Sequence, residues 1–509
     1  MIRLLFLTHR YLGIAMGLMI TLWCLSGFVM MYVQYPDLND QEQLTGLETL
    51  NFSTCCQTPN DFSNLEFDRF RVEMLNERPV LRLLNGSYQY VIDLLNGEYL
   101  PGFYDDDARS IASIVAKEFE LSGQPELLGL IEQDQWTVFP AYQAHRPLFH
   151  FSVNDSLGTE FYISSTTGEV VQMTTSGERF WNWIGAVVHW LYPTILRQNA
   201  YIWLQTVVWL TLISLFLTVI GIYIGLRQYK IRRNGRKSPY RGWALWHHYA
   251  GLIFGLFTLA WLVSGLFSVN PWGALEGRDF FLERQRLQGT TLDFEQISEF
   301  VSSHQWSEIT ENQIPGSSVR LEGVMVGNRI ALIASNADAS RARLNANSLR
   351  TEILPGAHFT NAGAMLRPQA LVRASDWIMG DDAYYFSHHQ TRRFPVYRIQ
   401  YEDGERFYLD NVSGELAFAV DRDRRWLRWI FHALHRGDFS RLLRSRPIWD
   451  FFMLPLMLGV TIGAITGTWI GIRRLVRAIK YPAKYPLNQL PEFDPAPAKS
   501  TVLSSNKSG

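Results

Sequence analysis

Four long stretches without a single charged side chain constrain the fold of this chain more than any other feature. They lie at residues 12–33, 203–226, 249–270 and 451–472 of the 509-residue sequence. Because a helix of about 20 apolar residues crosses the hydrocarbon core of a membrane, we predict four membrane-spanning helices. The first stretch is longer than the apolar region of a signal peptide, and no small-x-small cleavage site follows it. We therefore expect a signal anchor that stays attached.

The composition excludes two other classes of protein. The 47 basic and 48 acidic side chains give a formal net charge of −1, which argues against a nucleic-acid-binding protein that works through bulk charge. With 47% hydrophobic residues, the chain is too apolar to be mostly disordered. Its three cysteines cannot build a disulfide framework. We expect Cys55 and Cys56 to be plain loop residues and Cys24 to pack inside the first span.

Positive charge gathers on the short connections. Residues 227–246 hold seven Lys and Arg residues and no acid, and further basic residues follow the fourth span. The positive-inside rule then places both termini and this connection in the cytoplasm and the two long connections outside. We expect a multi-pass protein of the bacterial inner (cytoplasmic) membrane, in contact with membrane lipid.

The sequence also contains an internal duplication. A shift of 238 residues places the first span on the third, and a shift of 246 residues aligns the later parts of the two halves. The matching residues are His9/His247, Gly13/Gly251, Gly17/Gly255, Trp23/Trp261, His189/His435, Trp203/Trp449, Gly221/Gly467 and Gly225/Gly471. So many His, Gly and Trp matches at fixed offsets indicate a parallel tandem repeat.

The fold class that follows is a four-helix membrane core with two α+β outer domains. Residues 160–171 have the pattern strand, glycine-bearing turn, strand, and residues 404–416 and 88–100 repeat it. Helical spacing recurs at 107–120 and 293–303. The expected segments are span 1–35, outer domain 36–178, amphipathic surface helix 179–196, span 203–226, basic cytoplasmic loop 227–246, span 247–270, outer domain 271–422, surface helix 423–437, span 449–472 and a mostly disordered cytoplasmic tail 473–509.

Several motifs resemble the PepSY-associated transmembrane helix family. They are His9-Arg10-Tyr11-Leu12-Gly13, Trp23-Cys24-Leu25-Ser26-Gly27, Trp246-His247, His432-Ala433-Leu434-His435 and the Gly-Glu hairpins at 168–169 and 414–415. The resemblance covers nearly the whole chain except the tail. It implies PepSY modules outside the membrane. Members of this family are often described as iron-regulated membrane proteins, and some act as inner-membrane ferric-siderophore reductases that carry haem b. Because the family is not functionally uniform, the resemblance supports the predicted fold more strongly than any activity.

Paired histidines are the candidate haem ligands. His9 and His247 match in the repeat at the cytoplasmic ends of spans, and His189 and His435 match at the outer surface. Two imidazoles from facing helices can hold one haem iron from both sides, so one or two haems per chain are expected. Glycines four and eight residues beyond His9 and His247 leave room for a flat macrocycle. The same glycines could instead serve close helix packing.

Some site assignments stay open. His248 could replace His247 as a ligand, although the repeat aligns it with Arg10 and favours a headgroup contact. His432 could replace His435, because it lies one helical turn earlier. No catalytic side chain and no metal other than haem iron is expected.

Three functions compete. The first is a haem-dependent carrier that reduces a ferric chelate in the periplasm. Because no dinucleotide or phosphate-binding motif is present, it would need an external electron donor, either a quinol or a cytoplasmic reductase. The second is a non-redox PepSY protein that binds a peptide or protein as a sensor or scaffold. The third, a permease, is disfavoured by the absence of charges inside the spans. The sequence leaves monomer and homodimer open.

Overall fold

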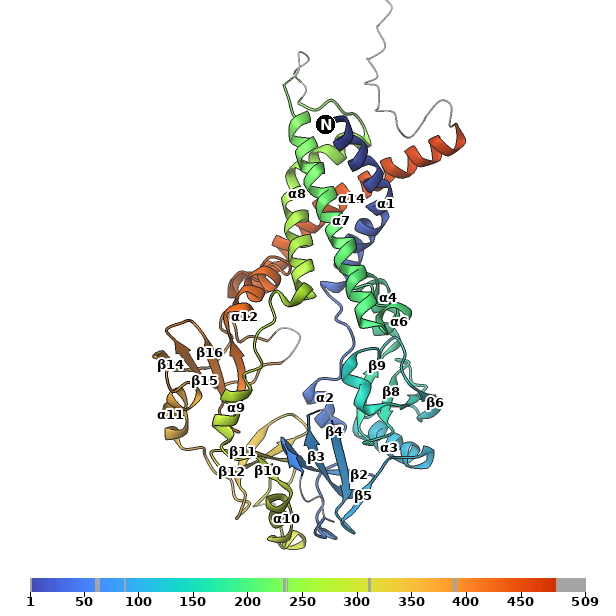
Figure 1. Ribbon diagram of the computed structural model, residues 1–509. Helices are drawn as coiled ribbons and strands as arrows, with labels where there is room; N and C mark the ends of the chain where they lie inside the picture. Colours follow the sequence, from blue (N-terminus) through green and yellow to red (C-terminus); the bar gives the residue numbers. More distant parts are fainter. Residues whose placement is uncertain are drawn as a thin grey trace, which may run out of the picture. The chain divides into compact units, whose positions relative to one another are not determined.

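A computed structural model describes residues 2–59, 65–86, 88–231, 235, 237–309, 313–387 and 391–481 (Figure 1). The chain separates into two compact units. The membrane unit comprises residues 1–25, 208–266 and 447–509, and the outer unit comprises residues 26–207 and 267–446. The expected tail beyond residue 481 and part of the basic loop lie outside the described residues.

Within the described residues, four helices are long and apolar enough to cross a membrane. They are α1 (Ile2–Met30), α7 (Ala200–Gln228), α8 (Trp243–Ser268) and α14 (Ile448–Lys480). Helices α7 and α14 contain their predicted spans and extend beyond them at both ends, whereas α1 and α8 begin earlier than predicted and end two or three residues short of the predicted outer boundary. Large apolar side chains such as Leu18, Leu256 and Phe451 remain exposed on them. An aliphatic surface of this kind is suited to lipid contact.

Small residues join these four helices into a closed bundle. A β-carbon added at Gly17 of α1 would lie 2.9 Å from Thr468 Oγ1 of α14, and one at Gly459 of α14 would meet Phe254 of α8. One at Gly255 of α8 would lie 2.9 Å from Ile222 of α7. Because such approaches leave no room for a side chain, they hold neighbouring backbones close together.

The outer unit is built around a seven-stranded sheet to which both halves of the chain contribute. Its order is β13-β12-β11-β2-β3-β4-β5, and β2 and β11 pair antiparallel. The strands are β2 (Arg69–Leu75), β3 (Arg78–Asn85), β4 (Tyr88–Asp93), β5 (Glu98–Leu100), β11 (Ser318–Val326), β12 (Arg329–Asn336) and β13 (Arg341–Asn345). The sequence predicts two separate outer domains, whereas the structure shows that they share this sheet.

Reciprocal ion pairs reinforce the junction between the halves. In the β2–β11 register, Glu73 lies opposite Arg320 and Arg71 lies opposite Glu322. Each couple forms a salt bridge, and Arg71 Nε lies 2.8 Å from Glu322 Oε2. Glu73 is fully buried and also accepts a hydrogen bond from Arg82 Nε at 2.7 Å. Cross-strand pairs of opposite charge stabilise a register, so these residues specify how the two halves meet.

Two further four-stranded sheets complete the outer unit, with orders β6-β7-β8-β9 and β14-β15-β16-β17. Their strands are β6 (Glu126–Ile131), β7 (Leu148–Ser152), β8 (Glu160–Ser164), β9 (Val170–Thr174), β14 (Val372–Ile378), β15 (Val396–Tyr401), β16 (Arg406–Asp410) and β17 (Leu416–Val420). Helix α3 (Asp105–Glu118) shares an apolar core with the first sheet and α11 (Gly356–Leu366) with the second. Further elements of this unit include α2 (Asp40–Thr45), α9 (Phe281–Gln288), α10 (Phe294–Ser302), α13 (Arg441–Arg444) and the pair β1 (Glu66–Phe67) with β10 (Leu292–Asp293).

The surface helices differ from the expected single segments. The first is broken into α4 (Ser176–Ile184), α5 (Ala186–His189) and α6 (Thr194–Arg197). The breaks fall at Gly185 and before Pro193, and neither residue favours the interior of a helix. The second begins as α12 (Arg422–Leu427) and continues as a π-helical turn over Arg428–Ala433.

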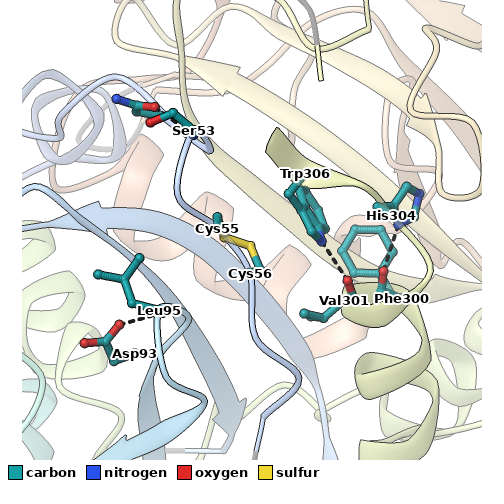
Figure 2. The surroundings of a disulfide bond; sticks show 10 residues. Ser53, Cys55, Cys56, Asp93, Leu95, Phe300, Val301, His304 and Trp306 are labelled. Atoms are coloured by element: carbon teal, nitrogen blue, oxygen red, sulfur yellow. Dashed lines mark hydrogen bonds between the residues drawn. A yellow bond between two sulfur atoms is a disulfide. The ribbon is translucent and has the colours of Figure 1, made fainter. Parts of the chain in front are cut away.

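Cys55 and Cys56 lie in a loop as expected, outside helices and strands, but they are not the unlinked residues that the sequence predicts. Cys55 and Cys56 are joined by a disulfide bond between sequence neighbours (Figure 2). Both lie half-buried against the apolar core that contains Phe52 and Trp306. The indole of Trp306 donates a hydrogen bond to the Val301 carbonyl at 2.7 Å, so the disulfide borders an ordered core and not a free loop.

Candidate functional site

The first histidine pair lies within the membrane unit. His9 of α1 and His247 of α8 have ring centroids 6.3 Å apart, and their planes are inclined by 33°. The two residues are 238 positions apart in the sequence, so the packing of the repeat brings them together. Both rings are half-buried among the helices. This pair is called the inner pair below.

Backbone carbonyls of the other two helices orient both rings of the inner pair. His9 Nδ1 lies 3.3 Å from the Leu217 carbonyl oxygen of α7, and His247 Nδ1 lies 3.0 Å from the Gly463 carbonyl oxygen of α14. A carbonyl only accepts, so each Nδ1 carries the proton and donates it. The lone pair of each imidazole is then on Nε2, which is the arrangement of a metal-ligating histidine with an oriented second nitrogen.

Two glycines leave space for the imidazoles themselves. A β-carbon at Gly221 would lie 2.7 Å from His9 Cε1, and one at Gly467 would lie 2.7 Å from His247 Cε1. Any larger residue at these positions would push the ring away. The glycines that the repeat aligns therefore make the same contact twice, once in each half.

The other glycines divide into two groups. Gly17 and Gly255 pack against neighbouring helices, so they do not provide the expected space for a macrocycle. Around Gly13 and Gly251, no described atom lies within 4 Å of an added β-carbon. These two are the residues one helical turn beyond His9 and His247, and they alone among the four glycines predicted beside the two histidines leave open space.

The second pair, called the outer pair below, lies within the outer unit. His189, the last residue of α5, and His435 have ring centroids 6.3 Å apart, with planes inclined by 71°. Ser26 Oγ lies 3.2 Å from His189 Nδ1. The outer pair thus repeats the separation of the inner pair on short, broken segments of chain.

The structure distinguishes the alternative ligands. Both ring nitrogens of His248 already have protein partners, since Nδ1 lies 2.8 Å from Ser238 Oγ and Nε2 lies 2.9 Å from the Gly225 carbonyl oxygen. His248 is therefore committed to contacts with Ser238 and with the carbonyl of Gly225 in α7. The ring of His432 packs edge-on against Phe386 at 5.6 Å, whereas His435 faces His189.

The spacing of both pairs fits an iron ion between two imidazoles. Two metal–nitrogen bonds of about 2.0–2.1 Å, plus about 1.1 Å from each nitrogen to its ring centre, span about 6.3 Å in total. Within the described chain, no cluster of three or more His, Cys, Asp or Glu side chains could hold a metal ion. The two-histidine sets therefore suit a metal whose remaining ligands come from a macrocycle, as in haem.

Sequence reasoning could not find the partners that orient the rings. The acceptors at Leu217 and Gly463 are backbone carbonyls, which carry no side-chain signature, but their spacing of 246 residues is that of the repeat. Ser26 does have a signal, because it lies in a motif that recurs at Ser264. No protein-family model matches the chain, and no curated protein matches it.

Proposed function

We propose that the chain is a haem b protein that carries electrons across the bacterial inner membrane and reduces ferric chelates of the siderophore type in the periplasm. The observation that supports this most strongly is the repeated separation of 6.3 Å in two independent histidine pairs. A packing role for the histidines would not require the same separation on such different scaffolds.

The chain's own residues have separable tasks in this proposal. Leu217 and Gly463 hold the proton on Nδ1 of the inner pair, and Gly221 and Gly467 let the rings approach the neighbouring helices. Haem b, when bound, supplies a one-electron couple whose potential depends on its ligands and surroundings. A quinol or a cytoplasmic reductase would be the electron donor, and the weaker Fe(II) chelate would release its metal.

A reduced-minus-oxidised visible spectrum of the detergent-purified chain tests the proposal. We expect a low-spin b-type spectrum with two haems per chain. His9→Ala and His247→Ala should each remove one haem, and His189→Ala and His435→Ala should each remove the other. His248→Gln, which keeps polar groups for the contacts with Ser238 and Gly225, is the matched control and should retain both. Unchanged haem content in all four ligand variants would end the proposal and favour the non-redox PepSY function.

The open space beside Gly13 gives a sharper test. Gly13→Leu fills a position around which no described atom lies within 4 Å, so helix propensity predicts a bundle as stable as the wild type or slightly more stable. If a macrocycle occupies this space, the variant should fold but lose the inner haem. Retention of both haems by a folded Gly13→Leu chain would contradict binding at the inner pair.

A further inference from the structure

Aromatic rings and two arginines form a cluster beside the sheet β14-β15-β16-β17 of the outer unit. The ring of Tyr385 stacks on that of Tyr408 of β16, with centres 4.9 Å apart and planes inclined by 17°. The rings of Tyr384 and Phe418 pack against the same apolar core and stay half-exposed. Together with the two arginines, these residues are called the arginine cluster below: Tyr384, Tyr385, Arg392, Arg406, Tyr408 and Phe418.

Each arginine of the cluster lies over aromatic rings. The guanidinium carbon of Arg392 lies 4.5 Å from the centre of the Phe418 ring and 5.2 Å from that of the Tyr385 ring. The guanidinium carbon of Arg406 lies 4.4 Å from the centre of the Tyr384 ring. A guanidinium stacked on a ring still has N–H groups in its own plane for an acceptor. The rings thus hold two cations at a half-exposed surface.

The nearest aspartates of this sheet are held by another arginine. Asp376 and Asp382 both pair with Arg398, at 2.8 Å and 2.9 Å. Within the part of the chain that the structure describes, no carboxylate forms a salt bridge with Arg392 or Arg406. The cluster therefore presents two cations that no ion pair of the described chain balances.

The side chain of Arg392 contacts the rings without a hydrogen bond. Its backbone N–H donates to Ser387 Oγ at 2.9 Å, but its guanidinium forms no hydrogen bond to any described residue. Arg406 does have a polar contact, with the Tyr408 hydroxyl, but this group is uncharged. Because donors in folded proteins are nearly always satisfied, the guanidinium of Arg392 is suited to an acceptor on a ligand.

The duplicated half shows that the fold does not require the cluster. The 246-residue shift aligns Arg406 and Phe418 with Glu160 and Gln172, and the strand pairing of the two sheets agrees with this alignment. Glu160 is paired with Arg179 at 2.9 Å. The first half thus has a paired carboxylate where the second half has an arginine on a ring.

The arginine cluster adjoins the chain segment of the outer histidine pair. Phe386 directly follows Tyr385, and its ring lies 5.6 Å from that of His432. His432 in turn lies three residues before His435 of the outer pair. A ligand at the cluster would therefore be held by residues next to those that contact this segment, as a substrate of the proposed electron transfer requires.

We propose that the arginine cluster binds the ferric chelate and selects an anionic chelate with aromatic ligand groups, namely a ferric tris-catecholate. This inference rests on the proposed function. A ferric tris-catecholate combines a net negative charge with planar rings, whereas an aliphatic ferric tris-hydroxamate is neutral and lacks such rings. Guanidinium groups attract the anion and donate hydrogen bonds to its oxygens, and the half-exposed rings of Tyr384 and Phe418 can pack against the catechol rings.

The test uses gallium(III) complexes of a hexadentate tris-catecholamide and of an aliphatic hexadentate tris-hydroxamate. Gallium(III) has the charge of Fe(III) but is not reduced in this assay, so binding is measured apart from electron transfer. Calorimetric titration of the full-length chain in detergent should show roughly tenfold or more tighter binding of the tris-catecholamide complex, as one charge-assisted contact predicts. Arg392→Gln and Arg406→Gln should each lower this affinity about tenfold and leave that for the tris-hydroxamate complex unchanged. Arg392→Lys should restore part of the loss.

Arg393→Gln is the matched control. Arg393 neighbours Arg392 but is already paired with Asp40 at 3.2 Å, so this variant should retain the preference. Equal affinity of the wild-type chain for both complexes would overturn the inference, as would binding of neither. Equal weakening of both complexes by Arg392→Gln would also overturn it, because the arginine would then be structural. These outcomes leave the proposed function to the haem content, which is measured separately.

Discussion

The membrane unit and the outer unit join the duplicated halves of the chain in opposite ways. In the membrane unit, the junction consists of uncharged close contacts such as Gly17 of the first half against Thr468 of the second, and Gly255 of the second against Ile222 of the first. In the outer unit, it is the β2–β11 strand pair with its reciprocal Arg–Glu salt bridges. The difference follows from the surroundings that each unit is built for.

In a bilayer, apolar burial gives no net drive between helices, so close packing and hydrogen bonds must hold them together. An isolated charge there is costly. In water, a sheet edge would expose unpaired backbone groups, and pairing two edges removes this liability. In the outer unit both paired strands carry the same pattern, Arg71-Val72-Glu73 and Arg320-Leu321-Glu322, so antiparallel pairing sets each arginine opposite a glutamate.

The outer junction should show the largest effect when it is broken. Glu73 is fully buried between Arg82 and Arg320. Glu73→Gln removes its charge and leaves two cations without their shared counter-ion, which costs about 3–5 kcal/mol for a buried pair. Urea unfolding of the full chain in detergent, followed by tryptophan fluorescence, measures the loss.

Glu118→Gln is the control for that experiment. Glu118 pairs with Lys117, whose side chain is 83% exposed, across 3.9 Å. A surface pair of this kind contributes about 0–1 kcal/mol. Equal midpoints for Glu73→Gln and Glu118→Gln would show that the β2–β11 salt bridges do not join the halves.

A smaller effect is expected at the helix contacts inside each half of the membrane unit. Gly221→Ala places a β-carbon 2.7 Å from His9 Cε1. Overpacking costs about 1–3 kcal/mol, and the gain in helix propensity of about 1 kcal/mol offsets part of it. We expect a small drop in thermal stability but a large drop in inner-pair haem content, because the ring must move. Gly177→Ala, at a position with open space in the outer unit, should leave both unchanged. Normal haem content in Gly221→Ala would contradict the assigned contact.

The sequence predicts more of the membrane unit than of the outer unit. The four uncharged stretches are sufficient to locate α1, α7, α8 and α14. Each helix nevertheless continues into polar residues beyond its stretch, so the absence of charge does not give the helix ends. The fixed offsets also predict which histidines meet. In contrast, the local sequence of residues 69–75 does not predict that this strand pairs with residues 318–326. Arg and Glu side chains on a strand can form ion pairs with many different neighbouring strands. The carbonyls that orient the inner pair are likewise set by helix packing.

The last test concerns acid, which should weaken only the outer junction. Burial raises the pKa of Glu73, but the charges of Arg320, Arg82 and Arg71 outweigh it and lower the pKa from 4.5 to about 2. Burial acts in the same direction on the pKa of Glu322, and Arg69 and Arg71 lower that pKa to about 2 as well. A group whose pKa is depressed on folding contributes stability above its unfolded pKa and loses it as the pH falls toward the folded value.

The stabilisation should therefore be complete above about pH 4.5 and decline between about 4.5 and 2. Hydrogen exchange of β2 and β11 amides, corrected for the intrinsic pH dependence of exchange, should show protection that is constant from about pH 7 to 5 and falls below about pH 4. In α7 and α14, the residues that form the membrane junction include no carboxylate, so their protection should not follow this curve. A parallel decline in both units would mean that acid acts through the fold as a whole, and the two junctions would then not be independent.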